Sequence, residues 1–259
     1  MRTSVILNQK GGVAKSATVI NVAAILAHYY GKRVLVVDGD SQGNTTEFFG
    51  ADPQWGNLAE VLRHGKDGGL FAIASIQSTN FPGVDILASD DSLMDLDLTA
   101  VKKDDTKVKV LQDMAAKLTE LDKYDYILHD CPPAFNAASA AALVAADEVI
   151  IPIKLDAFSL RGMTKILRQI TNMRTINPKL HVAGLLPTMW YKSNNMAEAE
   201  KTLKSSGLRV FPHIRRSNKV DDMTYVQEPL LVFSPRSAAG VDYRRFVRKW
   251  MGGAANGKR

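Results

Sequence analysis

The sequence predicts an α/β protein with a doubly wound, mostly parallel sheet and helices on both of its faces. Short apolar runs alternate with longer helix-compatible segments along nearly the whole chain, which is typical of this architecture. Several runs are continuously apolar, as in strands that are buried on both faces of a parallel sheet. A chain of 259 residues with 46% hydrophobic content can bury one large core. We therefore expect residues 1–259 to form a single domain.

The expected elements follow from these runs and from the glycine, proline and asparagine residues between them. The strands are expected at residues 3–8, 33–37, 84–87, 124–130, 149–153, 182–187 and 208–211. The helices are expected at residues 17–30, 57–62, 136–146, 159–176, 196–205 and about 237–251. Gly31 is an expected helix stop and Asn57 an expected helix cap. The closing helix should dock on the domain and leave 252–259 as a flexible tail.

A charged helical pattern occupies residues 90–122. Its expected buried stripe consists of Leu93, Leu96, Val101, Val108, Leu111, Met114 and Leu118. Apolar residues at this spacing indicate core packing against the sheet far more often than a binding groove.

The segment 8–16, Asn-Gln-Lys-Gly-Gly-Val-Ala-Lys-Ser, lies between the first expected strand and the first helix. A strand, a glycine-rich turn and a helix N-terminus make a phosphate site, because free N–H groups and the helix dipole offer positive partial charge. Gly11 and Gly12 let the main chain close on a polyphosphate. Lys15 can reach the terminal phosphates, and the Ser16 hydroxyl can bind Mg²⁺. An ordinary glycine turn is the alternative, and the flanking lysines disfavour it.

Three carboxylates are expected beside this loop. Asp38 and Asp40 follow the second strand, and Asp130 ends the strand at 124–130. Ligands of open α/β sheets bind at the carboxyl ends of the strands, so these groups should face the loop. We expect Asp130 to hold Mg²⁺ directly or through water, and Asp38 to support the same ion. Each alone could be a cap or turn residue, but together with Lys15 and Ser16 they indicate nucleotide hydrolysis.

The net charge of +6 is concentrated near the C-terminus. Residues 201–259 contain 13 Lys or Arg and 4 Asp or Glu, whereas residues 1–200 contain 20 and 23. Such a face suggests a polyanionic partner, although a merely solvated surface is the alternative. The candidates for contacts to DNA phosphates are Arg215, Arg216, Lys219, Arg244, Arg245, Arg248 and Lys249.

Composition excludes several other classes. No run approaches eighteen apolar residues, so no membrane span is expected, and the first strand leaves no room for a signal peptide. A single cysteine, Cys131, excludes a disulfide framework and favours a reducing compartment, so we expect a cytoplasmic protein. The histidines show no metal-ligand spacing.

The segment Lys10-Gly11-Gly12-Val13-Ala14-Lys15-Ser16 resembles the phosphate loop of the deviant Walker A ATPases, the ParA/MinD family. The family's usual form is Gly-Gly-Val-Gly-Lys-Thr, so Ala14 and Ser16 depart from it. Further similarity lies in residues 124–133, 149–152, 184–188 and 231–237. The resemblance implies the P-loop NTPase fold, with ATP and Mg²⁺ as ligands.

The resemblance also implies roles for individual residues. The implied ATP contacts are Lys10, Gly11, Gly12, Val13, Ala14, Lys15, Ser16 and Ala17, with Pro212 beside the adenine. Lys10 is the family's signature lysine, which crosses a two-fold interface to the ATP of the second subunit. Asp40 takes the place of the residue that orients the attacking water, with Ser41 where the family has proline. Lys10, Lys15 and Asp40 would therefore be the catalytic residues, although Lys10 could instead be a surface lysine near its own phosphates.

Among family members, the chain resembles the small ParA type without an N-terminal helix-turn-helix. This implies an ATP-induced sandwich homodimer that binds DNA non-specifically, and a slow ATPase that a ParB-like partner stimulates. A MinD-like ATPase that acts at the membrane surface is the alternative, because residues 243–251 are basic and aromatic. That segment coincides with the family's last core-docked helix, so we expect no membrane binding. An iron–sulfur member would need paired cysteines, which one cysteine cannot supply.

Overall fold

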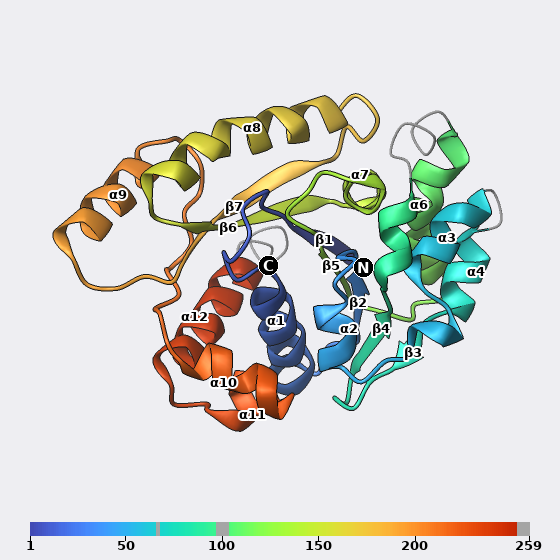
Figure 1. Cartoon of the computed structure of the whole chain (residues 1–259), viewed down its shortest axis with the longest axis horizontal. Helices are drawn as coiled ribbons and strands as arrows, with labels where there is room; N and C mark the ends of the chain where they lie inside the picture. Colours follow the sequence, from blue (N-terminus) through green and yellow to red (C-terminus); the bar gives the residue numbers. More distant parts are fainter. Residues whose placement is uncertain (66–67, 97–103, 253–259) are drawn as a thin grey trace.

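The structure is built on one sheet with helices packed against both faces (Figure 1). The computed structural model describes residues 1–65, 68–96 and 104–252. The strand order is β3-β4-β2-β5-β1-β6-β7, and the pairs are parallel except for the antiparallel β3–β4 edge. The strands are β1 Arg2–Ile6, β2 Val34–Asp38, β3 Gln77–Ser78, β4 Val84–Leu87, β5 Tyr126–Asp130, β6 Glu148–Lys154 and β7 His181–Thr188. The predicted fold class is confirmed.

Two layers of helices cover the sheet. One layer consists of α3, α4, α6, α7 and α8, and the other consists mainly of α1, α10, α11 and α12. The helices are α1 Lys15–Tyr30, α2 Asn44–Phe48, α3 Leu58–His64, α4 Gly68–Ala74, α6 Asp105–Glu120, α7 Ala137–Ala145, α8 Ala157–Met173, α9 Asn194–Lys204, α10 Lys219–Val226, α11 Leu230–Phe233 and α12 Ala238–Gly252. Two short 3₁₀ helices, η1 Pro53–Trp55 and η3 Asp91–Asp95, also occur.

The central strands are apolar throughout because both faces are covered. On β2, Val34 and Val36 enter the core under α1, whereas Leu35 and Val37 enter the core under α3, α6 and α7. This alternation uses every residue of the run, as expected for a parallel sheet between two helical layers. It explains why these segments show no polar–apolar alternation in the sequence.

Most of the expected element boundaries hold within a few residues. Gly31 ends α1 in a left-handed conformation at φ 59°, and its N–H donates to the Ala27 carbonyl 3.1 Å away. Asn57 caps α3 by accepting the Glu60 N–H at 3.0 Å. The buried stripe is confirmed at Leu93, Val108, Leu111, Met114 and Leu118. Leu96 is partly buried, and Val101 lies outside the described residues.

The prediction of a strand at residues 208–211 is wrong. Only Val210 makes a parallel bridge, to Leu185 on β7. Gly207 has a left-handed φ of 76°, and Pro212 has no N–H to continue a ladder. The segment is therefore too short, between these two residues, to extend the sheet.

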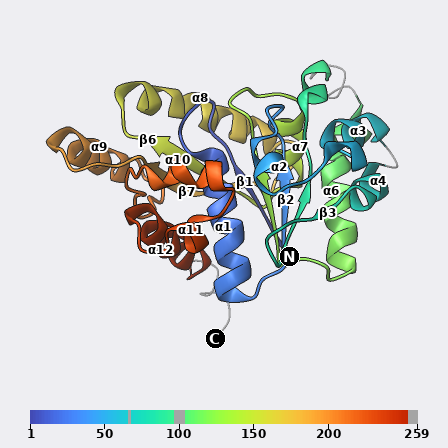
Figure 2. The same cartoon turned by 60° about the horizontal axis from the view of Figure 1, so that its bottom comes forward.

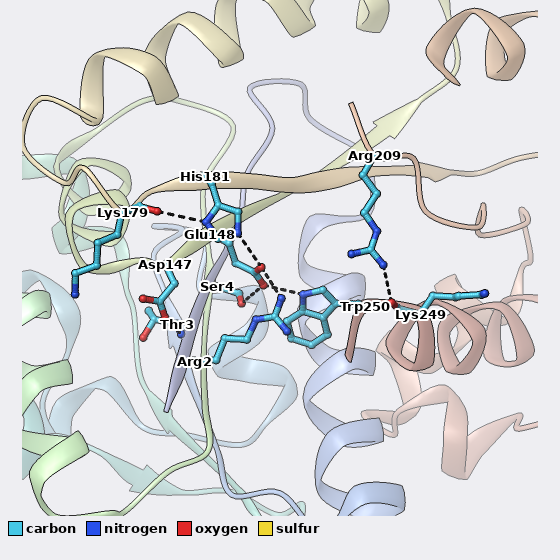
Figure 3. Close-up of polar contacts among 10 residues, drawn as sticks. All are labelled: Arg2, Thr3, Ser4, Asp147, Glu148, Lys179, His181, Arg209, Lys249 and Trp250. Carbon is cyan, nitrogen blue, oxygen red and sulfur yellow. Dashed lines mark hydrogen bonds and ion pairs between the residues drawn. The ribbon is translucent and has the colours of Figure 1, made fainter. Parts of the chain in front are cut away.

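The closing helix α12 docks on the core, side by side with α1 (Figure 2). Its aromatic side chains point inward, and the indole N–H of Trp250 donates to Glu148 Oε1 at 2.7 Å (Figure 3). Ser4 donates to the same oxygen at 2.8 Å, and the Arg2 guanidinium lies over the Trp250 ring, 4.6 Å from its centre. This buried carboxylate therefore ties α12 to the amino-terminal ends of β1 and β6. The expected tail lies almost wholly outside the described residues.

None of the described helices combines the length and apolar character needed to cross a bilayer.

Candidate functional site

The loop between β1 and α1 has an open, left-handed course. Gly12 has φ 64°, and Ala14 has φ 63° and ψ 37°, immediately before α1 begins at Lys15. No side chain caps this end of α1, so its first N–H groups remain available to an anion. A Cβ atom added to Gly11 or Gly12 would meet no described atom within 4 Å. The loop thus leaves room for a polyphosphate next to free donors.

Neighbouring strands hold this loop in place. The Asn8 amide donates to the Pro152 carbonyl at 2.6 Å, and the Thr188 hydroxyl donates to the Val13 carbonyl at 3.1 Å. Because Pro152 lies on β6 and Thr188 ends β7, the loop is fixed to the half of the sheet beyond β1. Such tethers pre-organise the donors before any ligand arrives.

Lys15 lies inside the loop. It is buried, and its Nζ atom donates to the Lys10 carbonyl at 3.1 Å. Burial lowers the pKa of Lys15, while the charges of Asp130 and Asp40 act in the opposite direction. The lysine thus lies in the electrostatic range of both carboxylates, as the sequence predicted.

Asp38 and Asp130 are register partners at the ends of β2 and β5, and both are fully buried. Burial, reinforced by the charge of Asp130, raises the pKa of Asp38 to about 7. Burial also raises the pKa of Asp130 to about 6, although Ser16, Thr45 and Lys15 favour its charged form. Buried carboxylates with raised pKa values are typical of functional sites, and a nearby cation would favour their charged forms.

Two threonines at the start of α2 orient these carboxylates. The Thr45 hydroxyl donates to Asp130 Oδ2 at 2.6 Å, and Thr46 donates to Asp38 Oδ2 through both its N–H and its hydroxyl, at 2.9 and 2.8 Å. The other oxygen of Asp130, Oδ1, is buried and accepts no hydrogen bond from the described part of the chain. Sequence reasoning missed both threonines, since only the fold brings residues so distant in sequence together.

The free Asp130 oxygen fits a magnesium ion. Mg²⁺ prefers hard oxygen ligands and is usually bound through one or two carboxylates together with phosphates and water. The buried Oδ1 atom beside the Ser16 hydroxyl and the open loop provides this donor set. Across residues 1–65, 68–96 and 104–252, no cluster of three or more His, Cys, Asp or Glu could hold a metal by itself. The phosphates of a nucleotide and water could supply the remaining oxygen ligands.

Asp40 follows Asp38 at the mouth of the site and is half-buried. Its N–H donates to Asp38 Oδ1 at 3.1 Å, and its Oδ1 atom accepts the Gln42 N–H at 3.1 Å. The Ser89 hydroxyl donates to the Asp40 carbonyl at 2.6 Å, which ties this turn to the end of β4. Asp40 is thus positioned by its backbone, with its carboxylate near Lys15.

Lys10 forms an ion pair within its own chain. Its Nζ atom lies 2.6 Å from Asp156 Oδ2, just beyond β6, with exposed side-chain fractions of 36% and 27%. Asp156 carries no motif and was not foreseen from the sequence. The pair holds Lys10 beside the loop that contains Lys15.

The predicted DNA-contacting residues differ in whether their side chains are already paired with a carboxylate in this structure. Arg215 forms a two-pronged ion pair with buried Asp242, at 2.7 and 3.0 Å, and Lys219 pairs with Asp222 at 2.8 Å. Arg216 is exposed. Arg244, Arg245 and Arg248 line a groove of about 460 Å³ together with Tyr29 and Tyr30, at the end of α1 away from the loop.

Lys249, a predicted DNA contact, and Pro212, a predicted adenine contact, lie together elsewhere on the surface. Both line a second groove of about 360 Å³, together with Arg209 and Phe211. No residue of the segment 8–16 lines this groove.

Comparison with known proteins places this geometry in context. A family model described as an AAA domain matches residues 1–182. The chromosome partitioning protein ParA of Caulobacter vibrioides is 30% identical over 255 residues, covering 96% of this chain and 93% of that protein. Apo McdA of Cyanothece has the same fold, with a TM-score of 0.84 at 23% identity over 97% of this chain and all of that one.

An ATP-analogue complex is also similar in structure. The cobyrinic acid a,c-diamide synthase of Mycobacterium smegmatis, with bound ATP analogue and magnesium, has a TM-score of 0.82 at 27% identity. The match covers 100% of this chain and 97% of that structure.

Proposed function

The chain belongs to the ParA/MinD family of deviant Walker A ATPases, and we propose that it is a DNA-partitioning ATPase. ATP binding assembles a homodimer, the dimer binds DNA without sequence preference, and hydrolysis releases it. Hydrolysis is slow until a ParB-like partner stimulates it. The observation that carries the proposal is the buried Asp130 carboxyl group, which lies beside Ser16 and Lys15 at an open phosphate loop. Likeness to a chromosome partitioning protein over 96% of the chain supports the cellular role.

ATP and Mg²⁺ are the ligands that this site suits. The N–H groups of the loop and of the first turn of α1 bind the phosphates, and Lys15 adds a full positive charge. Ser16 and Asp130 would hold the magnesium, and Asp38 would support the site from beside Asp130. When bound, Mg²⁺ neutralises the phosphate charge that develops during hydrolysis.

Hydrolysis requires an oriented water. Asp40 is the residue that we assign to this task, because its carboxylate lies at the mouth of the site and its backbone is held by Asp38 and Ser89. Lys15 stabilises the negative charge on the phosphates. Because Lys15 binds the phosphates and Asp40 orients the water, Asp40 is not needed for ATP binding.

Lys10 is proposed to act on the second copy of the chain. One buried lysine already serves the phosphates of its own loop, and Lys10 reaches outward to Asp156 instead. In the dimer, Lys10 would leave Asp156 and contact the nucleotide of the second subunit. A two-fold arrangement makes this exchange reciprocal.

The basic C-terminal region is proposed to bind the DNA backbone. Arg244, Arg245 and Arg248 are the strongest candidates, because they share one groove and the side chains of Arg245 and Arg248 are exposed. Arg216 is exposed, and Lys249 lies on the same helix as the three arginines. Arg215 serves the fold through Asp242, so its removal should act on stability more than on DNA contacts.

The proposal is tested by DNA binding and ATP turnover on one preparation, with ATP and with ADP. We expect DNA binding with ATP alone, and Asp40→Ala should bind ATP and DNA while its turnover falls at least about tenfold. Arg248→Ala should weaken DNA binding and lower its salt dependence by about one counterion, whereas Lys117→Ala, on the opposite helical layer, should not. Equal DNA binding with ATP and with ADP would contradict the proposal, and so would loss of ATP binding in Asp40→Ala.

A MinD-like action at the membrane surface is the alternative function. The aromatic residues of the closing segment would have to reach lipid, but Tyr243, Phe246 and Trp250 are fully buried. Vesicle flotation with ATP separates the two functions. Flotation with anionic vesicles, together with no binding to DNA, would favour the membrane role.

A further inference from the structure

The hydroxyl group of Thr45 makes the two oxygens of the Asp130 carboxyl group unequal. Both residues are buried, and Thr45 Oγ1 donates to Asp130 Oδ2 at 2.6 Å. A threonine hydroxyl has one proton to donate, and this bond uses it. The other oxygen, Asp130 Oδ1, is also buried and accepts no hydrogen bond from the part of the chain that the structure describes. One oxygen is therefore tied to the protein, and the other is left for a ligand.

The position of Thr45 in α2 explains why its hydroxyl reaches β5. A threonine inside a helix can donate to the carbonyl one turn earlier, as Thr119 does to Ala115 in α6 at 2.8 Å. Thr45 is the second residue of α2, so no helical carbonyl lies one turn before it. Its hydroxyl is therefore available for a bond across to the end of the strand that carries the carboxylate.

The next residue holds the backbone of Thr45 in place. Thr46 donates its N–H and its hydroxyl to Asp38 Oδ2, at 2.9 and 2.8 Å. The same hydroxyl accepts the Ser89 N–H at 2.9 Å. A β-branched side chain on a backbone held in this way has little freedom to turn its hydroxyl elsewhere. The bond from Thr45 to Asp130 is thus part of how the site is built.

Magnesium and calcium use carboxylates differently. Mg²⁺ requires near-octahedral geometry and keeps several waters, whereas the larger Ca²⁺ takes about six to eight oxygen ligands and also binds both oxygens of one carboxylate. For Ca²⁺ to bind both oxygens of Asp130, Thr45 would have to give up its hydrogen bond. Because Thr45 is buried, its hydroxyl would then lack a partner, which is unfavourable.

We propose that Thr45 determines the choice of metal at this site, Mg²⁺ over Ca²⁺, by keeping Asp130 Oδ2 out of coordination. Thr45 acts through Asp130 and is a positioning residue. The inference rests on the proposed function, because it states which cation the same nucleotide site selects.

The inference is tested by calorimetry on the full chain with a non-hydrolysable ATP analogue. The analogue is titrated as its Mg²⁺ complex, as its Ca²⁺ complex, and without metal in the presence of a chelator. In Thr45→Val, which keeps the shape and removes the hydroxyl, we expect the affinity for the Mg²⁺ complex to fall about tenfold. The affinity for the Ca²⁺ complex should fall less, so that the preference for Mg²⁺ decreases about fivefold or more. The affinity for the metal-free analogue should not change.

Two further variants separate this role from general support of the fold. Thr45→Ser keeps a hydroxyl and should retain the preference for Mg²⁺ within about twofold. Thr46→Val is the matched control, because it removes an adjacent buried hydroxyl that donates to Asp38 instead. It should leave the ratio of the Mg²⁺ and Ca²⁺ affinities unchanged.

The same preference for Mg²⁺ in Thr45→Val and in the unaltered chain overturns the inference. An equal loss of affinity for both complexes and for the metal-free analogue also overturns it, because Thr45 would then only support the fold. The unaltered chain tests the proposed function separately. If Mg²⁺ adds nothing to its affinity for the analogue, the magnesium site itself is wrong, and the inference fails with it.

Discussion

Asp38 and Asp130 lie directly opposite each other on β2 and β5, buried in the same place. Each would be ionised in water at neutral pH, but burial raises the pKa of Asp38 to about 7 and that of Asp130 to about 6. A pair of this kind is unfavourable until a cation neutralises it. We therefore expect the nucleotide-free protein to become more stable when one of the two carboxyl groups is neutralised, either by a bound cation or by substitution.

Replacement of Asp38 by asparagine should stabilise the nucleotide-free protein in a pH-dependent way. An acid whose pKa is raised on folding binds its proton more tightly in the folded state, so its unfavourable contribution grows as the pH rises from about 4 to about 7. We expect the free energy of unfolding of Asp38→Asn to exceed that of the unaltered chain by about 1–3 kcal/mol at pH 8. The difference should shrink toward pH 5.

Urea denaturation at both pH values measures this effect. Asp95→Asn, at an exposed position, is the control and should change stability little at either pH. An equal gain at pH 5 and pH 8 would mean that the effect does not come from ionisation.

Ala14→Gly should relieve strain in the phosphate loop. Ala14 adopts φ 63° and ψ 37°, a left-handed conformation that costs a residue with a Cβ atom about 1–2 kcal/mol. Glycine removes this cost but gives the unfolded chain more freedom, so the net gain in unfolding free energy should be about 0.5–1 kcal/mol. Ala17→Gly, inside the first turn of α1, should have the opposite sign. Thermal unfolding of the two variants measures this difference. A loss of stability in both variants would contradict the interpretation that Ala14 is strained.

The sequence predicted what local patterns encode. The parallel sheet follows from continuous apolar runs such as 33–37, and the phosphate loop follows from a glycine turn between a strand and a helix. It also marked Ala14 as a departure from the usual loop. It could not predict Thr45 and Thr46 as carboxylate partners, because these contacts join residues that only the strand order brings together.

The basic residues illustrate the same limit. Charge counting selected Arg215 and Arg244 alike, but a buried partner, Asp242, occupies the guanidinium of Arg215. The aromatic residues near the C-terminus were open to two interpretations from sequence, and the burial of Trp250 against Glu148 assigns them to the core. Contacts between residues distant in the sequence, which charge counting does not reveal, thus decide which basic side chains remain available to a partner.

His129→Leu should stabilise the protein, most strongly at acid pH. The imidazole is buried on β5, neither ring nitrogen has a partner among the described residues, and burial lowers its pKa to about 3. An unsatisfied buried polar group costs about 1–3 kcal/mol, so we expect a gain of about 1–2 kcal/mol at pH 7. A depressed pKa means that only the unfolded chain takes up the proton between about pH 6.5 and pH 3, so the gap should widen at pH 5. Urea denaturation at the two pH values measures it, and a variant less stable than the unaltered chain at pH 5 would contradict the prediction.

Asp156→Asn should favour the ATP-dependent dimer. Lys10 and Asp156 form a partly exposed ion pair, so its loss should change the unfolding free energy by less than about 1 kcal/mol. If Lys10 must leave Asp156 to reach the second subunit, removal of the carboxylate charge lowers the cost of that exchange. An exposed pair of about 0.2–1 kcal/mol in each of two subunits corresponds to a dimerisation constant about two- to thirtyfold tighter.

Sedimentation equilibrium with ATP measures that constant, in an Asp40→Ala background that slows turnover. Asp222→Asn removes the partner of Lys219 in a comparable exposed pair and should leave dimerisation unchanged. A weaker dimer in Asp156→Asn would instead mean that Asp156 supports the interface, either by holding Lys10 in a productive position or by contacting the second subunit. The sign of the change therefore distinguishes a contact that restrains Lys10 in the monomer from one that the dimer uses.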